Sequence, residues 1–213
     1  MSDQSTALAK LGRVVAVLRS PTSERVLATA RAVVDGGVQT LEITLNTPDA
    51  LTLIKDARAD HPSEIRVGAG TVLSAADADA AIAAGAEFLV TPTVVPDVLH
   101  EASGHGVPVI CGAFSPTEIS AAWVAGAAAV KIFPIRTLGP AYLADVLGPL
   151  SGIPLVPSGG VTAAEVPVYL RAGAAAVAIG GGVLSPGLVF GDFDRVRSSC
   201  EQIISSLPVT PPA

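Results

Sequence analysis

The sequence predicts a closed (β/α)8 barrel with an extra N-terminal helix. Short β-branched and apolar runs alternate regularly with alanine-rich amphipathic stretches along the chain. Strands that are apolar at nearly every position are typical of a parallel sheet covered on both faces. Eight such strand–helix units within 213 residues match a small barrel.

The eight predicted strands are taken from the apolar runs between glycine, proline and charged residues. They span residues 13–19, 39–45, 65–70, 87–92, 107–112, 128–134, 153–159 and 175–181. An open doubly wound sheet is the alternative. That fold usually carries a glycine fingerprint after its first strand, and "VLRSPTSE" has none, so the barrel is favoured.

The helices between the strands have recognisable start and stop residues. Four clear examples span 21–37, 74–86, 115–127 and 162–174. Thr22 or Ser23 is expected to cap the first of them, and Ser74 the second, with Asp77 three residues further on. Each of the four has a glycine before the next strand, which allows the left-handed turn that ends a helix.

The chain is predicted to form a single catalytic barrel over residues 1–207. The stretch "STALAKLG", residues 5–12, is expected to be the extra helix across one end of the barrel. Residues 208–213 are proline-rich and are expected to form an extended tail.

Composition excludes several classes of protein. Half of the residues are hydrophobic, yet no apolar run reaches the roughly 18 residues of a membrane span. The 13 basic and 19 acidic side chains give a net charge of −6 without a basic cluster, which argues against nucleic-acid binding. The N-terminus lacks the layout of a secretion signal, and Cys111 and Cys200 are interpreted as free thiols, so the protein is expected in the cytoplasm.

Lys131 stands inside an apolar run, "AAVKIFP", that otherwise indicates a buried strand. Burying an ammonium without a partner is costly, so such a lysine loses its proton or finds a partner. One interpretation is a structural ion pair with Glu42. The other is a nucleophile, because a confined apolar site favours the neutral amine that attacks a carbonyl. The two interpretations are compatible.

Other polar residues are predicted at the carboxyl ends of strands, where barrel active sites lie. Glu42 is a lone carboxylate in strand 39–45 and suits proton transfer. Arg19 is either a solvated strand-end residue or a ligand for a carboxylate or phosphate. The remaining candidates are Thr71, Pro92, Phe133 and Ser158.

Glycine turns follow the last two predicted strands, in "SGGV" and "GGGV". In barrels, turns at these two strands commonly bind phosphate through backbone N–H groups. The phosphate-binding candidates are Gly159, Gly160, Gly181 and Gly182. The three histidines, His61, His100 and His105, lack ligand spacing, so no metal site is predicted.

The motifs "VVAVLR", "LEITLNTPDA", "VGAGTVL", "FLVTPT", "VKIFP", "GPAYL", "PSGGV" and "AIGGGVL" occur together over residues 8–205. This set resembles the family of 2-keto-3-deoxy-6-phosphogluconate (KDPG) and 4-hydroxy-2-oxoglutarate aldolases. The resemblance implies a cofactor-free class I aldolase on a (β/α)8 (TIM) barrel, assembled as a homotrimer. It also implies that Lys131 forms a Schiff base and that Glu42 is the general acid and base.

The resemblance assigns the remaining candidates as well. Thr71, Pro92 and Phe133 would line a pyruvate pocket, and the four glycines would hold the phosphate. Three departures stand out: Asn46 where some members have arginine, Ser158 where many have threonine, and Gly182 where serine is common. Arg19 is expected to replace the missing arginine, and a hydroxyl at Ser158 tilts the preference towards the gluconate substrate. Gly182 leaves phosphate binding to backbone amides.

The resulting hypothesis is reversible cleavage of 2-keto-3-deoxy-6-phosphogluconate to pyruvate and glyceraldehyde 3-phosphate. 4-Hydroxy-2-oxoglutarate is a further candidate substrate, and 2-keto-3-deoxy-6-phosphogalactonate is the alternative one. Two other hypotheses stay open on the residues alone: a phosphate-binding barrel isomerase, and a non-catalytic ligand-binding barrel in which Lys131 and Glu42 form only a stabilising pair.

Overall fold

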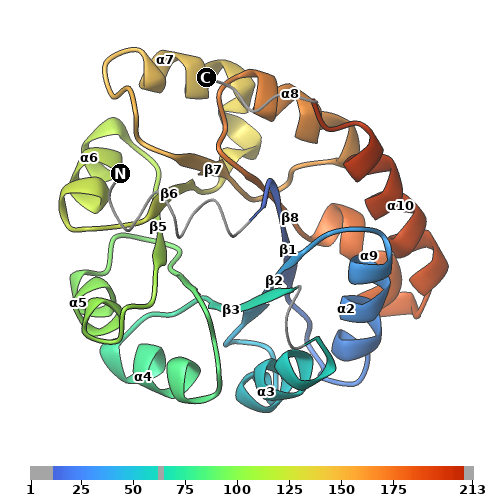
Figure 1. The fold of residues 1–213 in the computed structure, drawn as a ribbon. Helices are drawn as coiled ribbons and strands as arrows, with labels where there is room; N and C mark the ends of the chain where they lie inside the picture. Colours follow the sequence, from blue (N-terminus) through green and yellow to red (C-terminus); the bar gives the residue numbers. More distant parts are fainter. Residues whose placement is uncertain (1–11, 62–64, 209–213) are drawn as a thin grey trace.

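A computed structural model describes residues 12–61 and 65–208, which form a nearly closed barrel of eight parallel strands (Figure 1). The strands lie in the order β7-β6-β5-β4-β3-β2-β1-β8. Ala175 N donates to Leu155 O at 2.9 Å, which joins the two ends of this order. The strands are β1 Val14–Leu18, β2 Thr40–Thr44, β3 Arg66–Gly70, β4 Leu89–Val90, β5 Val109–Ala113, β6 Ala129–Ile132, β7 Leu155–Pro157 and β8 Val177–Ile179. The predicted barrel is confirmed.

The helices form a ring around the barrel (Figure 1). They are α2 Val26–Asp35, α3 Ala50–Asp60, α4 Ala75–Ala83, α5 Pro96–Gly104, α6 Pro116–Val124, α7 Gly139–Leu147, α8 Val166–Arg171, α9 Gly181–Phe190 and α10 Phe193–Ser205, with short 3-10 helices η1 Ile135–Thr137 and η2 Ala163–Glu165. No helix in these described ranges is long and apolar enough to cross a membrane. All but the last residue of the predicted helix at 5–12, and all but the first residue of the tail at 208–213, lie outside the described residues.

One of the two predicted N-terminal helix caps is present in the structure. Ser74 accepts a hydrogen bond from Asp77 N at 3.1 Å, so the predicted cap of α4 is confirmed. The predicted cap of the first helix is wrong, because α2 begins at Val26, and the preceding residue makes no side-chain cap. Ser23 instead donates to the Asp49 carboxylate at 2.8 Å, which ties the loop after β1 to the loop after β2.

The barrel interior is filled by side chains that alternate along the strands. Successive residues of a strand point to opposite faces, so every second residue points inward. The inner cluster is small and apolar: Val15, Val17, Phe88, Val90, Ile110, Ala129, Val156, Ala176 and Ala178. The Phe88 ring fits because a Cβ at Gly68 would lie 2.6 Å from it. The larger core lies between the strands and the helices.

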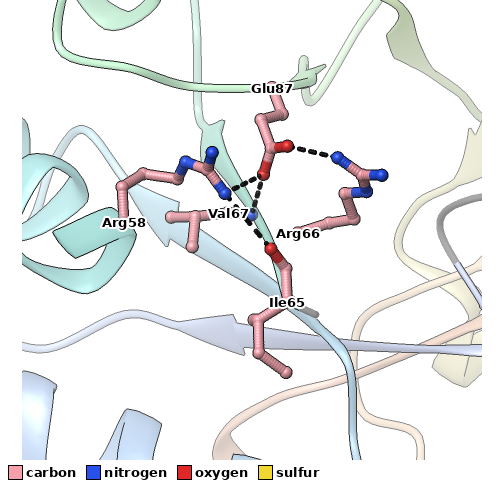
Figure 2. A network of polar contacts seen from close by, with 5 residues as sticks. All are labelled: Arg58, Ile65, Arg66, Val67 and Glu87. Atoms are coloured by element: carbon pink, nitrogen blue, oxygen red, sulfur yellow. Dashed lines mark hydrogen bonds and ion pairs between the residues drawn. The ribbon is translucent and has the colours of Figure 1, made fainter. Parts of the chain in front are cut away.

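A charged cluster connects α3, β3 and the segment before β4 at the amino-terminal ends of the strands (Figure 2). We call Arg58, Arg66 and Glu87 the Glu87 cluster. Arg58 Nη1 and Val67 N both donate to Glu87 Oε2, at 2.7 and 3.1 Å, while Arg66 donates to the other oxygen. The active sites of barrels lie at the opposite end, the carboxyl ends of the strands. The Glu87 cluster is therefore expected to stabilise the fold.

Candidate active site

Lys131 points into the barrel because it lies two residues after the inner-cluster residue Ala129 on β6. Lys131 is only 4% exposed. The Nζ atom lies 5.3 Å from the centroid of the Phe133 ring, two residues further on. The aromatic face is a favourable neighbour for a cation. The structure therefore places the amine in a mostly apolar enclosure at the carboxyl ends of the strands.

Glu42 on β2 faces the same interior and is 1% exposed. Its Oε1 lies 3.6 Å from Lys131 Nζ. This separation is that of an ion pair rather than a hydrogen bond, and among the described residues Oε1 has no hydrogen-bond partner. The carboxylate occupies the space beside Gly70 of β3, where a Cβ would lie 2.7 Å from the Glu42 Cδ atom.

A cavity of about 270 Å³ opens beside this pair. It contains seven of the predicted site residues, and three further residues complete its wall. The lining consists of Val17, Arg19, Lys131, Phe133, Ser158, Gly159, Gly160, Ala178, Gly180 and Gly181. The ends of β1, β6, β7 and β8 therefore build one pocket, as expected for a barrel.

Arg19 and Thr71 meet at the edge of this pocket. Arg19 Nη2 donates to Thr71 Oγ1 at 3.3 Å, across the ends of β1 and β3. Thr71 has a φ of 58°, a left-handed conformation that costs a β-branched residue free energy. Strain of this kind gathers at functional sites, and here it accompanies a side chain in contact with a cavity-lining arginine.

Four predicted residues lie outside the cavity lining: Glu42 and Thr71, which contact the lining residues Lys131 and Arg19, and Pro92 and Gly182. The Pro92 backbone packs against Gly112 of β5, where a Cβ would meet the Pro92 carbonyl group. Gly182 is exposed in the first turn of α9, next to the Val161 carbonyl. Three lining residues were not predicted: Val17, Ala178 and Gly180. Their inward register on β1 and β8 could have indicated them, since Val17 lies two residues before Arg19.

The glycine turns offer an anion-binding surface. Gly159 and Gly160 have φ values of 92° and 88°, a conformation that glycine adopts without steric cost. Helix α9 begins at Gly181, and the first N–H groups of a helix have no acceptor within it. Such groups, with the helix dipole, attract anions.

The two cysteines are free and buried, and neither lines the cavity. Burial raises the pKa of the Cys111 thiol, and burial with the nearby Glu201 carboxylate raises the pKa of Cys200 to about 11. Both are therefore protonated near neutral pH and unsuited to nucleophilic attack. Lys131, in contrast, brings an amine to the cavity wall.

Among the described residues, one group of side chains could hold a metal ion, on α4 and at the end of α5. The ligand atoms of Asp79, Glu101 and His105 lie within 4.8 Å of one another. His105 Nε2 is 3.2 Å from Glu101 and 3.9 Å from Asp79. Sequence spacing had not indicated this group, because Asp79 comes from the neighbouring helix.

A parallel barrel with an enclosed amine, a carboxylate and glycine turns at the carboxyl ends of its strands defines a TIM-barrel enzyme. The sequence profile described as "Aldolase: KDPG and KHG aldolase" matches residues 6–199. The chain therefore belongs to the KDPG and KHG aldolase family, and it is a carbon–carbon lyase.

Individual relatives carry two substrate names. A Treponema pallidum protein named 2-dehydro-3-deoxy-phosphogluconate aldolase is 34% identical over 200 residues, 92% of this chain and 94% of the relative. An Escherichia coli K12 protein named 2-dehydro-3-deoxy-6-phosphogalactonate aldolase is 36% identical over 171 residues, 78% of this chain and 82% of that one.

A solved structure adds a chemical observation about another protein. A KDPG aldolase from Legionella pneumophila, with pyruvate captured as a covalent carbinolamine intermediate, matches with a TM-score of 0.83. The two sequences are 25% identical, over 95% of this chain and 98% of the Legionella chain.

Proposed function

We propose that this protein is a class I aldolase that cleaves 2-keto-3-deoxy-6-phosphogluconate reversibly to pyruvate and glyceraldehyde 3-phosphate. One observation carries the proposal: the enclosed Lys131 amine lies 3.6 Å from the Glu42 carboxylate, at a cavity bordered by glycine turns. The amine matches the electron sink that such a cleavage needs. The captured intermediate of the Legionella relative is of the same chemical type.

In the proposed mechanism, neutral Lys131 attacks the C2 ketone and forms a carbinolamine. Glu42 transfers the protons that let this adduct lose water and become an iminium ion. Glu42 then takes the proton of the C4 hydroxyl, the C3–C4 bond breaks, and its electron pair moves into the iminium to give an enamine. Glyceraldehyde 3-phosphate leaves. Protonation of the enamine at C3 and hydrolysis of the imine release pyruvate and restore the lysine.

The other residues position the substrate. Arg19, with Thr71 beside it, holds the substrate carboxylate, because a guanidinium matches a carboxylate with two parallel hydrogen bonds. Phe133 forms the apolar wall next to the amine. Ser158 lines the cavity, and Pro92 follows the end of β4. The N–H groups of Gly159, Gly160, Gly181 and Gly182 receive the phosphate.

The substrate preference is proposed from Ser158 and from the relatives. A hydroxyl at this position favours the gluconate epimer, and the Treponema relative carries that name. The galactonate epimer is the second candidate, because the Escherichia coli relative is named for it. Rates of cleavage of both phosphorylated epimers and of 4-hydroxy-2-oxoglutarate would rank the three substrates.

We further propose a cytoplasmic homotrimer whose catalytic domain spans residues 1–207. Exposed large apolar side chains support self-association: Val124 is 83% exposed and Phe190 is 78% exposed. Light scattering on the purified protein measures the assembly.

Borohydride reduction in the presence of pyruvate tests the reaction type. We expect one reduced pyruvate unit on the peptide that contains Lys131, with irreversible loss of cleavage activity. Lys131→Ala should lose both the adduct and the activity, whereas Lys55→Ala, which removes an exposed lysine of α3, should keep both. An active enzyme without an adduct would indicate an isomerase or another mechanism. A folded protein with neither adduct nor cleavage would indicate a binding barrel.

A further inference from the structure

We propose that Arg136 recognises the phosphate group of the substrate and determines the preference for phosphorylated over unphosphorylated keto acids. This inference rests on the proposed aldolase function. Arg136 lies in η1, three residues after Phe133 of the cavity wall. It is not part of the motifs by which the family is recognised here.

The backbone of η1 is joined to the glycine turn after β7. Ile135 N donates to Ser158 O at 2.8 Å, and Arg136 N donates to Gly159 O at 3.2 Å. These two hydrogen bonds hold η1 beside the turn that lines the cavity. The position of Arg136 relative to the turn is therefore fixed by the main chain.

The side chain of Arg136 lies across Gly160. A Cβ at residue 160 would lie 2.9 Å from both Cζ and Nη2 of Arg136 and closer still to its Nε. Any side chain there would displace the guanidinium, and the φ of 88° also favours glycine. The turn thus combines exposed backbone with an adjacent cation.

Within the described ranges the guanidinium of Arg136 has no hydrogen bond or ion pair, and Arg136 is exposed after β6, at the end of the barrel that carries the cavity. Arg58 and Arg66, by contrast, are both engaged by Glu87. The donors of Arg136 are available to a ligand. A guanidinium binds phosphate with two parallel hydrogen bonds, which are stronger than those between neutral groups.

The second glycine turn lies next to the first. A Cβ at Gly182 would lie 3.7 Å from the Val161 carbonyl oxygen, one residue after Gly160. An anion at the start of α9 is therefore close to the turn that Arg136 covers. Residue 182 is a glycine and offers no hydroxyl, so the charge of Arg136 supplies what the turn's own side chains do not.

3-Phosphoglycerate and glycerate differ only in the phosphate group. Comparing their dissociation constants, measured by calorimetry, therefore isolates the contribution of phosphate recognition. Arg136→Met removes the charge but keeps an unbranched stem over Gly160. We expect the dissociation constant for 3-phosphoglycerate to rise roughly 10- to 100-fold, relative to the change for glycerate. The dissociation constant of Arg136→Lys for 3-phosphoglycerate should lie between those of the wild type and Arg136→Met, because lysine keeps the charge but loses the paired donors.

Arg171→Met is the matched control. Arg171 is an exposed arginine at the end of α8, at the opposite end of the barrel, so its loss should leave both dissociation constants unchanged. In kinetics, the KM for the phosphorylated substrate should rise in Arg136→Met, relative to that for 4-hydroxy-2-oxoglutarate.

Equal changes for the two binding probes, or no change for either, would overturn the proposal and leave Arg136 as a cover for Gly160. The pyruvate adduct on Lys131, measured in the same preparations, reports separately on the aldolase function. An adduct with unchanged 3-phosphoglycerate binding refutes Arg136 alone. If Arg136→Met selectively weakens 3-phosphoglycerate binding but the wild type forms no pyruvate adduct, the aldolase mechanism is refuted and the role of Arg136 stands.

Discussion

Two glutamates next to cations, Glu42 and Glu87, lie at opposite ends of the barrel and are held very differently. Glu87 lies before β4 and accepts hydrogen bonds on both oxygens, from two arginines and a backbone N–H (Figure 2). Its side chain keeps 20% of its surface exposed. Glu42 is almost fully enclosed, and its Oε1 has only the Lys131 amine at 3.6 Å.

This difference separates stabilisation from reactivity. A carboxylate with several good donors lowers the free energy of the folded state, because each charged hydrogen bond contributes about 1.5–3 kcal/mol. An enclosed carboxylate without such donors lowers stability and is retained where it performs chemistry. Glu42 Oε1 thus has spare acceptor capacity for a substrate proton, whereas Glu87 already accepts three hydrogen bonds.

The largest effect is expected from Glu42→Gln. The amide keeps the shape beside Gly70 but cannot take up the C4 hydroxyl proton, so kcat for aldol cleavage should fall roughly 10²- to 10⁴-fold. Steady-state kinetics measure the loss, and urea unfolding verifies that the variant is folded. A folded variant with kcat within about threefold of the wild type would remove Glu42 from the mechanism.

Glu87→Gln is the counterpart at the other end. It removes the charge that both arginines share, so the free energy of unfolding should fall by about 1–3 kcal/mol. The kcat should stay within about twofold, since the Glu87 cluster lies far from the cavity. Urea titration followed by circular dichroism measures the first quantity. The assignment fails if activity falls more than stability does.

The smallest effect is expected from Asp60→Asn. Asp60 pairs with Arg31 at 2.7 Å, but their side chains are 34% and 57% exposed. Solvent and salt screen such a pair, so the free energy of unfolding should change by less than about 0.5 kcal/mol, and less again in high salt. If Asp60→Asn lowered the free energy of unfolding as much as Glu87→Gln does, solvent exposure would not explain why the two ion pairs differ in their contribution to stability.

The fold and the central pair could be predicted because both depend on residue order. Apolar runs fixed the strands, and the alternation of β6 placed Lys131 on the inner face. The cap at Thr22 or Ser23 was wrong because the loop between β1 and α2 is held by Asp49, which is distant in sequence. The Glu87 cluster was not predicted, since Glu87 was assigned to the first position of a longer strand, 87–92, whereas β4 begins at Leu89.

The cavity was predicted less completely than the pair. Apolar wall residues such as Val17 and Ala178 look like any other core residue in the sequence. Gly182 and Pro92 follow strands as expected, but position after a strand does not determine which residue borders the space. Arg136 was missed because its role depends on η1 folding back onto the turn after β7.

Gly70 carries a consequence for how this barrel can change. The carboxylate of Glu42 occupies the volume that a methyl group at residue 70 would need, so the two positions are coupled, although 28 residues of chain separate their numbers (70 − 42 = 28). An alanine at residue 70 would force the Glu42 side chain to move. Any side chain at residue 70 therefore changes the position of the carboxylate that faces Lys131.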